Sequence, residues 1–101
     1  MTEFSNQGEI LTTGTVLLTG TNQTILKDKI LGIRFNNPLA YNIKLYRYDY
    51  VTATIILIYN LNLSAGDTLT DDLTYALNYG DEIIAYSDIP GTAYYTHGQI
   101  F

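Results

Sequence analysis

The 101-residue sequence contains no cysteine and no tryptophan, and only 15% of its residues are charged. Without cysteine the chain has no disulfide, no thiolate metal ligand and no cysteine nucleophile. The only histidine is His97, and no serine stands in a glycine-flanked elbow, so the usual partners of a nucleophilic site are missing. A metal site would need almost all-oxygen ligands. We therefore expect no enzyme, no bound metal and no cofactor.

Long apolar stretches are also missing from the chain. The longest uninterrupted apolar run, from Ile55 to Tyr59, is far shorter than a membrane-spanning helix. The first seven residues have neither the basic nor the apolar segment of a secretory signal peptide. We therefore expect a protein that is made in the cytoplasm and has no membrane partner.

Threonine, asparagine, tyrosine, isoleucine and leucine are abundant instead, a composition typical of β-strands. Apolar and polar side chains alternate most clearly from Tyr41 to Tyr48, and the longest predicted strand runs from Val51 to Leu63. About eight short strands predict an all-β fold, an antiparallel β-sandwich of jelly-roll or immunoglobulin-like topology. The length allows a single domain, residues 9–101. The polar residues 1–8 are predicted to form a flexible N-terminal arm that becomes ordered on contact with a partner.

Glycines indicate where several strands turn. From Ile10 to Leu18 the alternation predicts one strand, with Gly14 as a bulge or bend. The pairs Gly66-Asp67 and Gly80-Asp81 each precede a further strand. At such a corner glycine supplies a positive φ, and the aspartate accepts hydrogen bonds from nearby backbone amides. A calcium loop would need more carboxylates at alternate positions than the sequence offers.

The net charge is −5, and the charges are unevenly distributed along the chain. All five Lys and Arg residues lie between Lys27 and Arg47, whereas the chain from Asp49 onward has seven acids and neither Lys nor Arg. This is either a chance distribution or a dipolar module whose basic face meets an acidic face on a neighbour, as head-to-tail self-assembly would need. Homo-oligomers therefore stay open as partners. With a pI of about 4.4 the chain offers no phosphate-binding groove, and we expect no nucleic-acid partner.

Tyrosine is unusually frequent, with ten copies. Its amphipathic ring suits protein interfaces and sugar stacking, but tyrosines also simply fill sheet faces by cross-strand pairing. Tyr46 and Tyr48 alternate with Ile43 and Leu45 along their strand. If these two aliphatic side chains belong to the core, the two tyrosines face outward and are candidates for contacts.

The stretch from Tyr46 to Gly98 resembles small β-sandwich virion proteins of tailed bacteriophages. The resemblance lies in an aromatic-bearing strand followed by the run from Thr54 to Leu63, the two Gly-Asp corners, and a closing strand with Gly98 near its end. It covers about half of the chain. The composition, rich in asparagine, isoleucine, tyrosine and leucine, is similar to that of phages infecting gut Bacteroidetes, including the crAss-like group with its auxiliary capsid proteins.

The resemblance implies a virion structural protein, of the auxiliary capsid or decoration type, that binds the major capsid protein or other virion proteins on the head surface. Two alternatives stay open. One is a neck or tail-completion protein that forms a closed ring, and the other is a carbohydrate-binding β-sandwich module, which the lack of tryptophan disfavours. The predicted interface residues come from the arm, the basic segment and the outward tyrosines: Phe4, Lys27, Lys29, Lys44, Tyr46 and Tyr48.

Overall fold

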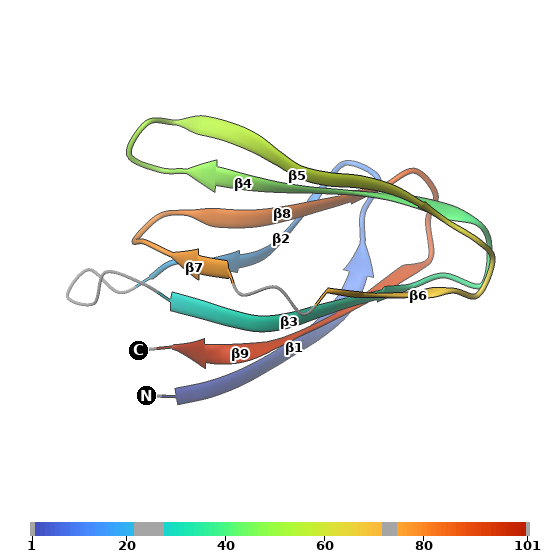
Figure 1. Ribbon diagram of the computed structural model, residues 1–101, viewed down its shortest axis with the longest axis horizontal. Helices are drawn as coiled ribbons and strands as arrows, with labels where there is room; N and C mark the ends of the chain where they lie inside the picture. Colours follow the sequence, from blue (N-terminus) through green and yellow to red (C-terminus); the bar gives the residue numbers. More distant parts are fainter. Residues whose placement is uncertain (1, 22–27, 72–74, 101) are drawn as a thin grey trace.

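Nine β-strands and no helix make up the computed structural model, which describes residues 2–21, 28–71 and 75–100, so the predicted all-β fold is confirmed (Figure 1). In chain order the strands are β1 (Thr2–Ile10), β2 (Thr15–Thr19), β3 (Asp28–Asn36), β4 (Tyr41–Asp49), β5 (Thr54–Leu63), β6 (Thr68–Asp71), β7 (Tyr75–Leu77), β8 (Glu82–Ser87) and β9 (Thr92–Ile100). A search of the described residues finds no helix able to cross a membrane.

The strands form a sandwich of two antiparallel sheets. Sheet A has the order β1-β9-β3-β6, with β7 also paired to β3, and sheet B has the order β2-β8-β4-β5. The first four strands alternate between the sheets, and the last strands return in the opposite order. This is the strand order of a jelly roll. An immunoglobulin-like sandwich, in which the first two strands share a sheet, does not fit.

The jelly roll arises from one long antiparallel hairpin that is rolled up. Thr2 pairs with Ile100, and inward from these ends β2 pairs with β8, β3 with β6 and β7, and β4 with β5. The two ends of the chain therefore lie side by side, as Figure 1 shows. The tip of the hairpin is a turn at residues 50–53, so the strand predicted from Val51 begins only at Thr54.

The core lies between the two sheets. The alternation predicted for β4 is confirmed, because Tyr41, Ile43 and Leu45 are at most 3% exposed. Each large side chain buried in this way contributes about 1.5–3 kcal/mol to the free energy of folding. Sheet A supplies its share of the core mainly from β3 and from the ends of its other strands. The buried apolar residues are Ile10, Leu17, Ile33, Phe35, Tyr41, Ile43, Leu45, Tyr75, Leu77, Ile83 and Ala85.

Residues 2–8 are a strand and not the predicted flexible arm. They form most of β1, with Glu3 opposite Gln99 and Gly8 opposite Tyr94 on β9. Phe4 is half-buried and packs against the core. The polar composition predicted an arm because it contains no information about β9, which comes from the far end of the chain and offers a free edge for pairing.

The single strand predicted from Ile10 to Leu18 is also wrong. β1 ends at Ile10, and a turn carries the chain from sheet A to sheet B before β2 begins at Thr15. Gly14 closes this turn with a φ of 103°, a conformation in which a side chain is strained. After the turn Leu17, and not Val16, points into the core. A period of two cannot be followed across a turn that changes sheets.

β5 is an edge strand of sheet B and contains a β-bulge. Leu45 of β4 pairs with Tyr59 and the next residue, Tyr46, pairs with Leu57, so Ile58 is an extra residue in β5. Ile58 and Tyr59 both pack against the core. The bulge therefore shifts the alternation of faces by one residue at the middle of the strand.

Candidate functional site

The outer face of sheet B, the face turned away from sheet A, carries its side chains in cross-strand rows. Cross-strand partners share one side of a sheet, and the outer residues alternate with the buried Leu45 and Ala85, which pair with each other. Taken from β5 towards β2, the rows contain Ile55, Tyr48, Glu82 and Thr19; then Leu57, Tyr46, Ile84 and Val16; then Asn60, Lys44 and Tyr86; and finally Asn62 and Asn42.

The second of these rows is apolar on all four strands. Leu57 and Val16 at its two ends are 50% and 46% exposed, and Tyr46 and Ile84 between them are half-buried. Ile55 in the neighbouring row is 60% exposed. The solvent face of an antiparallel sheet is ordinarily polar. An apolar row that crosses the whole sheet is therefore typical of a contact surface.

Two hollows lie on this outer face. The first has a volume of about 410 Å³ and is lined by Tyr46, Ile84 and Tyr86, with Lys44 and Asp88 among its polar residues. The rings of Tyr46 and Tyr86 meet edge to face, with centroids 5.5 Å apart and planes at 83°. This arrangement is favourable for aromatic pairs. The hollow thus combines aromatic and charged groups.

The second hollow, of about 540 Å³, lies at the end of the sheet near the β4–β5 turn and is lined by tyrosines. Tyr48 and Tyr50 come from β4 and its turn, and Tyr79 from the turn before β8. Tyr50 and Tyr79 meet edge to face at 5.9 Å. Glu82 is the acidic residue of this hollow. The two hollows together extend the aromatic character of the face beyond the apolar row.

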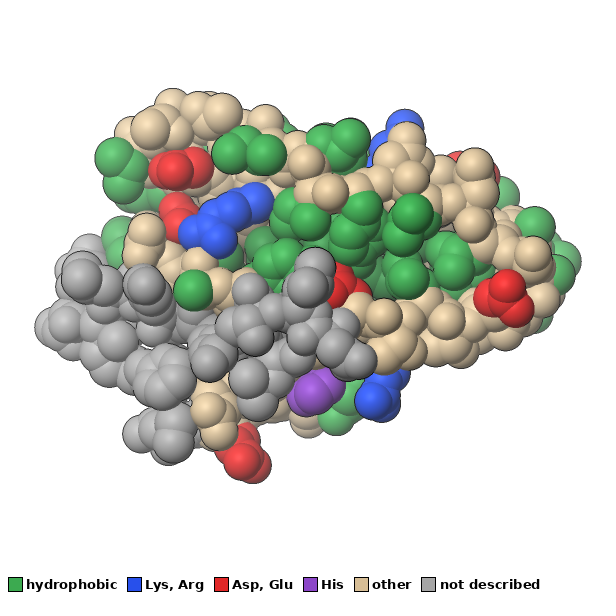
Figure 2. Space-filling view, viewed as in Figure 1, with side chains coloured by type: hydrophobic (Ala, Val, Ile, Leu, Met, Phe, Trp, Pro, Cys, Tyr) green, Lys and Arg blue, Asp and Glu red, His purple; other side chains and the backbone are tan. Residues whose placement is uncertain are grey.

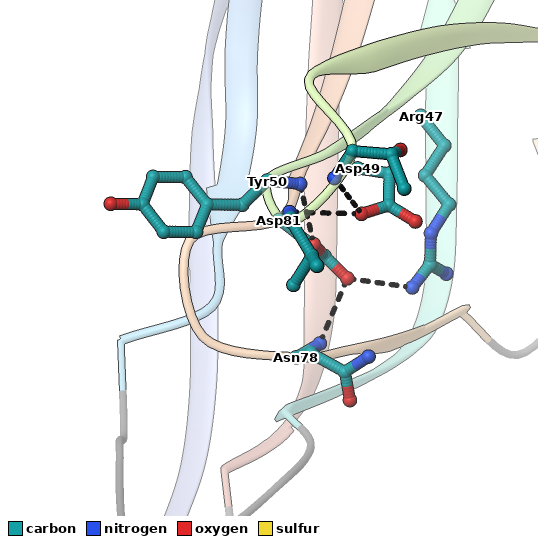
Figure 3. Close-up of polar contacts among 7 residues, drawn as sticks. Arg47, Asp49, Tyr50, Asn78 and Asp81 are labelled. Carbon is teal, nitrogen blue, oxygen red and sulfur yellow. Dashed lines mark hydrogen bonds and ion pairs between the residues drawn. The ribbon is translucent and has the colours of Figure 1, made fainter.

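Asp81 fixes the turns at this end of the sheet (Figure 3). Asp81 is 1% exposed, and its carboxylate accepts hydrogen bonds from the backbone N–H of Tyr50 at 3.0 Å and of Asn78 at 3.1 Å. It also pairs with the Arg47 guanidinium at 2.9 Å. Burial raises the pKa of the Asp81 carboxyl, but these donors outweigh it and hold the pKa below its ordinary value. The carboxylate therefore stabilises the tyrosine-lined end of the outer face.

A second buried carboxylate joins the two sheets from the inside. Asp71 at the end of β6 accepts hydrogen bonds from the hydroxyls of Tyr59 at 2.8 Å and of Tyr75 at 2.5 Å. Burial raises the pKa of both tyrosine hydroxyls, and the hydrogen bond to Asp71 raises it further. These contacts hold β5 of sheet B against β6 and β7 of sheet A. They lie away from the outer face and have a structural role.

The structure brings together three of the six predicted interface residues. Lys44, Tyr46 and Tyr48 all lie on the outer face of sheet B, where the sequence predicted the two tyrosines. Phe4 lies in sheet A and packs against the core. Lys27 lies outside the described residues, and of Lys29 only the backbone, within β3, is described.

The basic residues whose side chains are described do not form one face. Arg34 is exposed on β3 in sheet A, Lys44 is exposed on sheet B, and Arg47 turns inward to Asp81. The common basic face that a dipolar module would need, one of the two explanations left open for the charge distribution, is therefore not found for these three residues. Charges that are neighbours in sequence are separated because successive strands lie in different sheets and alternate faces.

Sequence analysis missed several residues of the outer face. Val16 lies on β2 and not on the single strand predicted from Ile10 to Leu18. Ile84 and Tyr86 lie between residues of the core on β8, with burial alternating from Glu82 to Ser87. The alternation in β8 could have identified these last two. The exposed state of β5 could not have been identified, because it depends on β5 being at the edge.

The residues considered for catalysis do not converge in the described parts of the chain. His97 stacks on Tyr95, with ring centroids 5.7 Å apart, on β9 of sheet A. Ser87 is buried and hydrogen-bonds to Thr92 and to the Ile89 carbonyl. No group of three metal-ligating side chains occurs among the described residues. Comparison with known proteins finds no matching family model and no matching curated protein.

Proposed function

We propose that this protein is a non-catalytic structural component of a bacteriophage virion, an auxiliary capsid or decoration protein that binds the head surface through the outer face of sheet B. The observation that carries the binding part is the apolar row of Leu57, Tyr46, Ile84 and Val16, which crosses the whole sheet in contact with solvent. The virion part is based on the resemblance of the stretch from Tyr46 to Gly98, and jelly rolls recur in viral capsid proteins.

The composition of the outer face supports a protein partner. Aromatic residues are enriched in the centres of protein interfaces and charged residues are depleted there. Here Tyr46 lies in the apolar row, while Lys44 and Glu82 lie in the rows on either side of it. Each contact can be weak when many copies bind a symmetric shell, because several simultaneous contacts add to the avidity.

Quantitative mass spectrometry of purified virions tests this proposal. Very many copies per particle support decoration of the head, a single ring's worth supports a neck or tail-completion protein, and absence from the particle contradicts a virion role. The surface is tested by Tyr46→Ser combined with Leu57→Ser, which should reduce incorporation at least tenfold. The matched control is Tyr95→Ser, on the outer face of sheet A, which should leave incorporation unchanged.

A carbohydrate-binding module is the second candidate, and the 410 Å³ hollow favours it. A tyrosine pair, Tyr46 and Tyr86, lies there beside groups that could bind hydroxyls, Lys44 and Asp88. Glycan-array binding that is lost in Tyr86→Ser would support this candidate. A silent array together with intact binding to virions would exclude it.

A further inference from the structure

Strand β5 differs from the other sheet edges in this fold. A strand at an edge offers unpaired backbone N–H and C=O groups to any other chain, and proteins ordinarily protect it with charge, shortness or interruption. β1 carries Glu3 and Glu9, β2 has only five residues, and the edge formed by β6 and β7 is divided into pieces of four and three residues. β5 has ten residues, no charged side chain and no proline.

The side chains of β5 are also exposed on both faces of sheet B. Ile55 and Leu57 on the outer face are 60% and 50% exposed, and Ile56 and Leu61 on the inner face are 52% and 41% exposed. Figure 2 shows a band of apolar side chains open to solvent between the β4–β5 hairpin and the strands β3 and β6 below it. None of the described strands pairs with the second side of β5. This edge thus has exposed apolar side chains on both of its faces.

The bulge at Ile58 gives β5 a symmetric pattern of faces. From Thr54 to Ile58 the side chains lie in turn on the inner, outer, inner, outer and inner face of sheet B. From Tyr59 to Leu63 they again lie in turn on the inner, outer, inner, outer and inner face. The order is the same in both directions. When two such strands pair antiparallel over their full length, every outer residue meets an outer one and every inner residue meets an inner one. Without the bulge the same full-length pairing of ten residues would join outer to inner positions, because the side-chain period is two.

We infer that β5 pairs antiparallel with β5 of a second copy of this chain, about a two-fold axis between Ile58 and Tyr59. Two antiparallel copies make an isologous contact, the commonest kind in homodimers. In this register Ile56 of one copy faces Leu61 of the other, so the two exposed inner side chains cover each other. The two B sheets become one continuous sheet of eight strands.

The lack of charge on β5 lets a second copy approach at this edge despite the net charge of the chain. Each copy has a net charge of −5, so two copies repel wherever acidic surfaces meet. β5 has no charged residue, and its facing pattern is complementary to itself. A strand from a different protein would need to match that pattern by chance. The dimer also places the outer faces of two B sheets side by side, so it doubles the area of the proposed binding surface. The pairing of β5 does not depend on what that surface binds.

Sedimentation analysis of the purified chain and two charge variants tests the pairing. The wild type should be a dimer, and its association should strengthen with added salt, which screens the net charge. The variants Ile56→Lys with Leu61→Lys, and Ile56→Glu with Leu61→Glu, place like charges opposite each other and should each be monomers. An equimolar mixture of the two should recover a one-to-one dimer, with an affinity at least about tenfold higher than either variant alone.

Two controls separate this pairing from other outcomes. Val51→Lys adds a charge in the adjacent turn, where the side chain is 83% exposed, and should leave the dimer intact. Circular dichroism should show a folded all-β chain for every variant, since positions 56 and 61 are half exposed. A monomeric wild type at 100 μM, or variants that stay monomeric when mixed, overturns the inference. Either result leaves the virion measurement unaffected, so failure of the dimer and failure of the proposed function are distinguishable.

Discussion

The carboxylate of Asp81 offers the sharpest test of how this fold is held together. It accepts two backbone N–H groups and the Arg47 guanidinium, and these donors come from the β4–β5 hairpin and from the turn before β8. Asp81→Asn keeps the shape of the side chain but leaves one oxygen for three donors. We therefore expect the variant to lose the ion pair and at least one of the hydrogen bonds. The NH2 group of the amide would also face N–H donors with which it cannot form a hydrogen bond.

The magnitude follows from the burial of the group. A hydrogen bond to a charged group is worth about 1.5–3 kcal/mol, and leaving a buried donor without a partner costs a similar amount. The side chain of Arg47 is 29% exposed, so water replaces part of the lost interaction with Asp81. We expect Asp81→Asn to lower the free energy of unfolding by about 2–4 kcal/mol. For a domain of this size that corresponds to a fall in Tm of about 10–25 °C.

Asp67 provides a matched control, because it follows a glycine at the equivalent corner. Gly66 and Gly80 have φ values of 78° and 81°, and the N–H of each following aspartate bonds to the carbonyl three residues earlier. Asp67 is exposed, however, and Asp67→Asn should change the free energy of unfolding by no more than about 0.5 kcal/mol. Urea unfolding at pH 7 measures both variants. Equal losses for the two substitutions would refute the reasoning.

The same site has a pH signature. Because the pKa of Asp81 is lowered in the folded state, its contribution to stability is present above the unfolded pKa of about 3.8. It is lost as the pH falls below that value and through the folded pKa. The wild type should therefore lose stability in acid more steeply than Asp81→Asn, and the difference between the two should shrink towards pH 2. A difference that does not depend on pH would contradict the role of the charge.

Two further predictions concern glycine and tyrosine contacts. Gly80→Ala should destabilise the fold by several kcal/mol, because the added Cβ would lie 2.3 Å from the ring of Tyr50. Gly66→Ala, where nothing lies within 4 Å of the added Cβ, should cost only about 1 kcal/mol for its positive φ. Thermal unfolding of the two variants measures the difference. Tyr75→Phe removes a hydroxyl from the buried Asp71 and should cost about 1–3 kcal/mol in urea unfolding. The pKa of Tyr75 is raised in the folded state, so its contribution to stability is present below the unfolded pKa of 10.0 and is lost as the pH rises above that value. Ultraviolet titration should show this hydroxyl ionising only when the protein unfolds.

Local pattern was sufficient for much of the fold. The alternation in β4 placed Tyr41, Ile43 and Leu45 in the core, and it placed Tyr46 and Tyr48 on the other face. These predictions held because β4 is a central strand, paired with β8 on one side and β5 on the other. The alternation of its side chains alone therefore separates those that face the core from those that face outward. The glycine corners were also predicted correctly, since a positive φ is a local property of the backbone.

Predictions that depended on distant partners were wrong. Residues 2–8 have the composition of an arm, but the free edge of β9 makes them a strand. Arg34 and Lys44 are close in sequence, but they lie on different faces of the molecule because their strands belong to different sheets. The two Gly-Asp corners look alike, yet only Asp81 is enclosed by another turn. None of these differences is encoded within a window of a few residues.

The sequence by itself determined that the chain is all β, which residues of β4 are buried, and that no cysteine is present for disulfide or thiolate chemistry. Side-chain period and residue chemistry are local properties, so they can be evaluated without knowing the fold. Only the tertiary structure decided the jelly-roll order, the apolar row across sheet B and the unprotected edge of β5. These features depend on which strands become neighbours and which strand is left at the edge, and that is settled when distant segments pair.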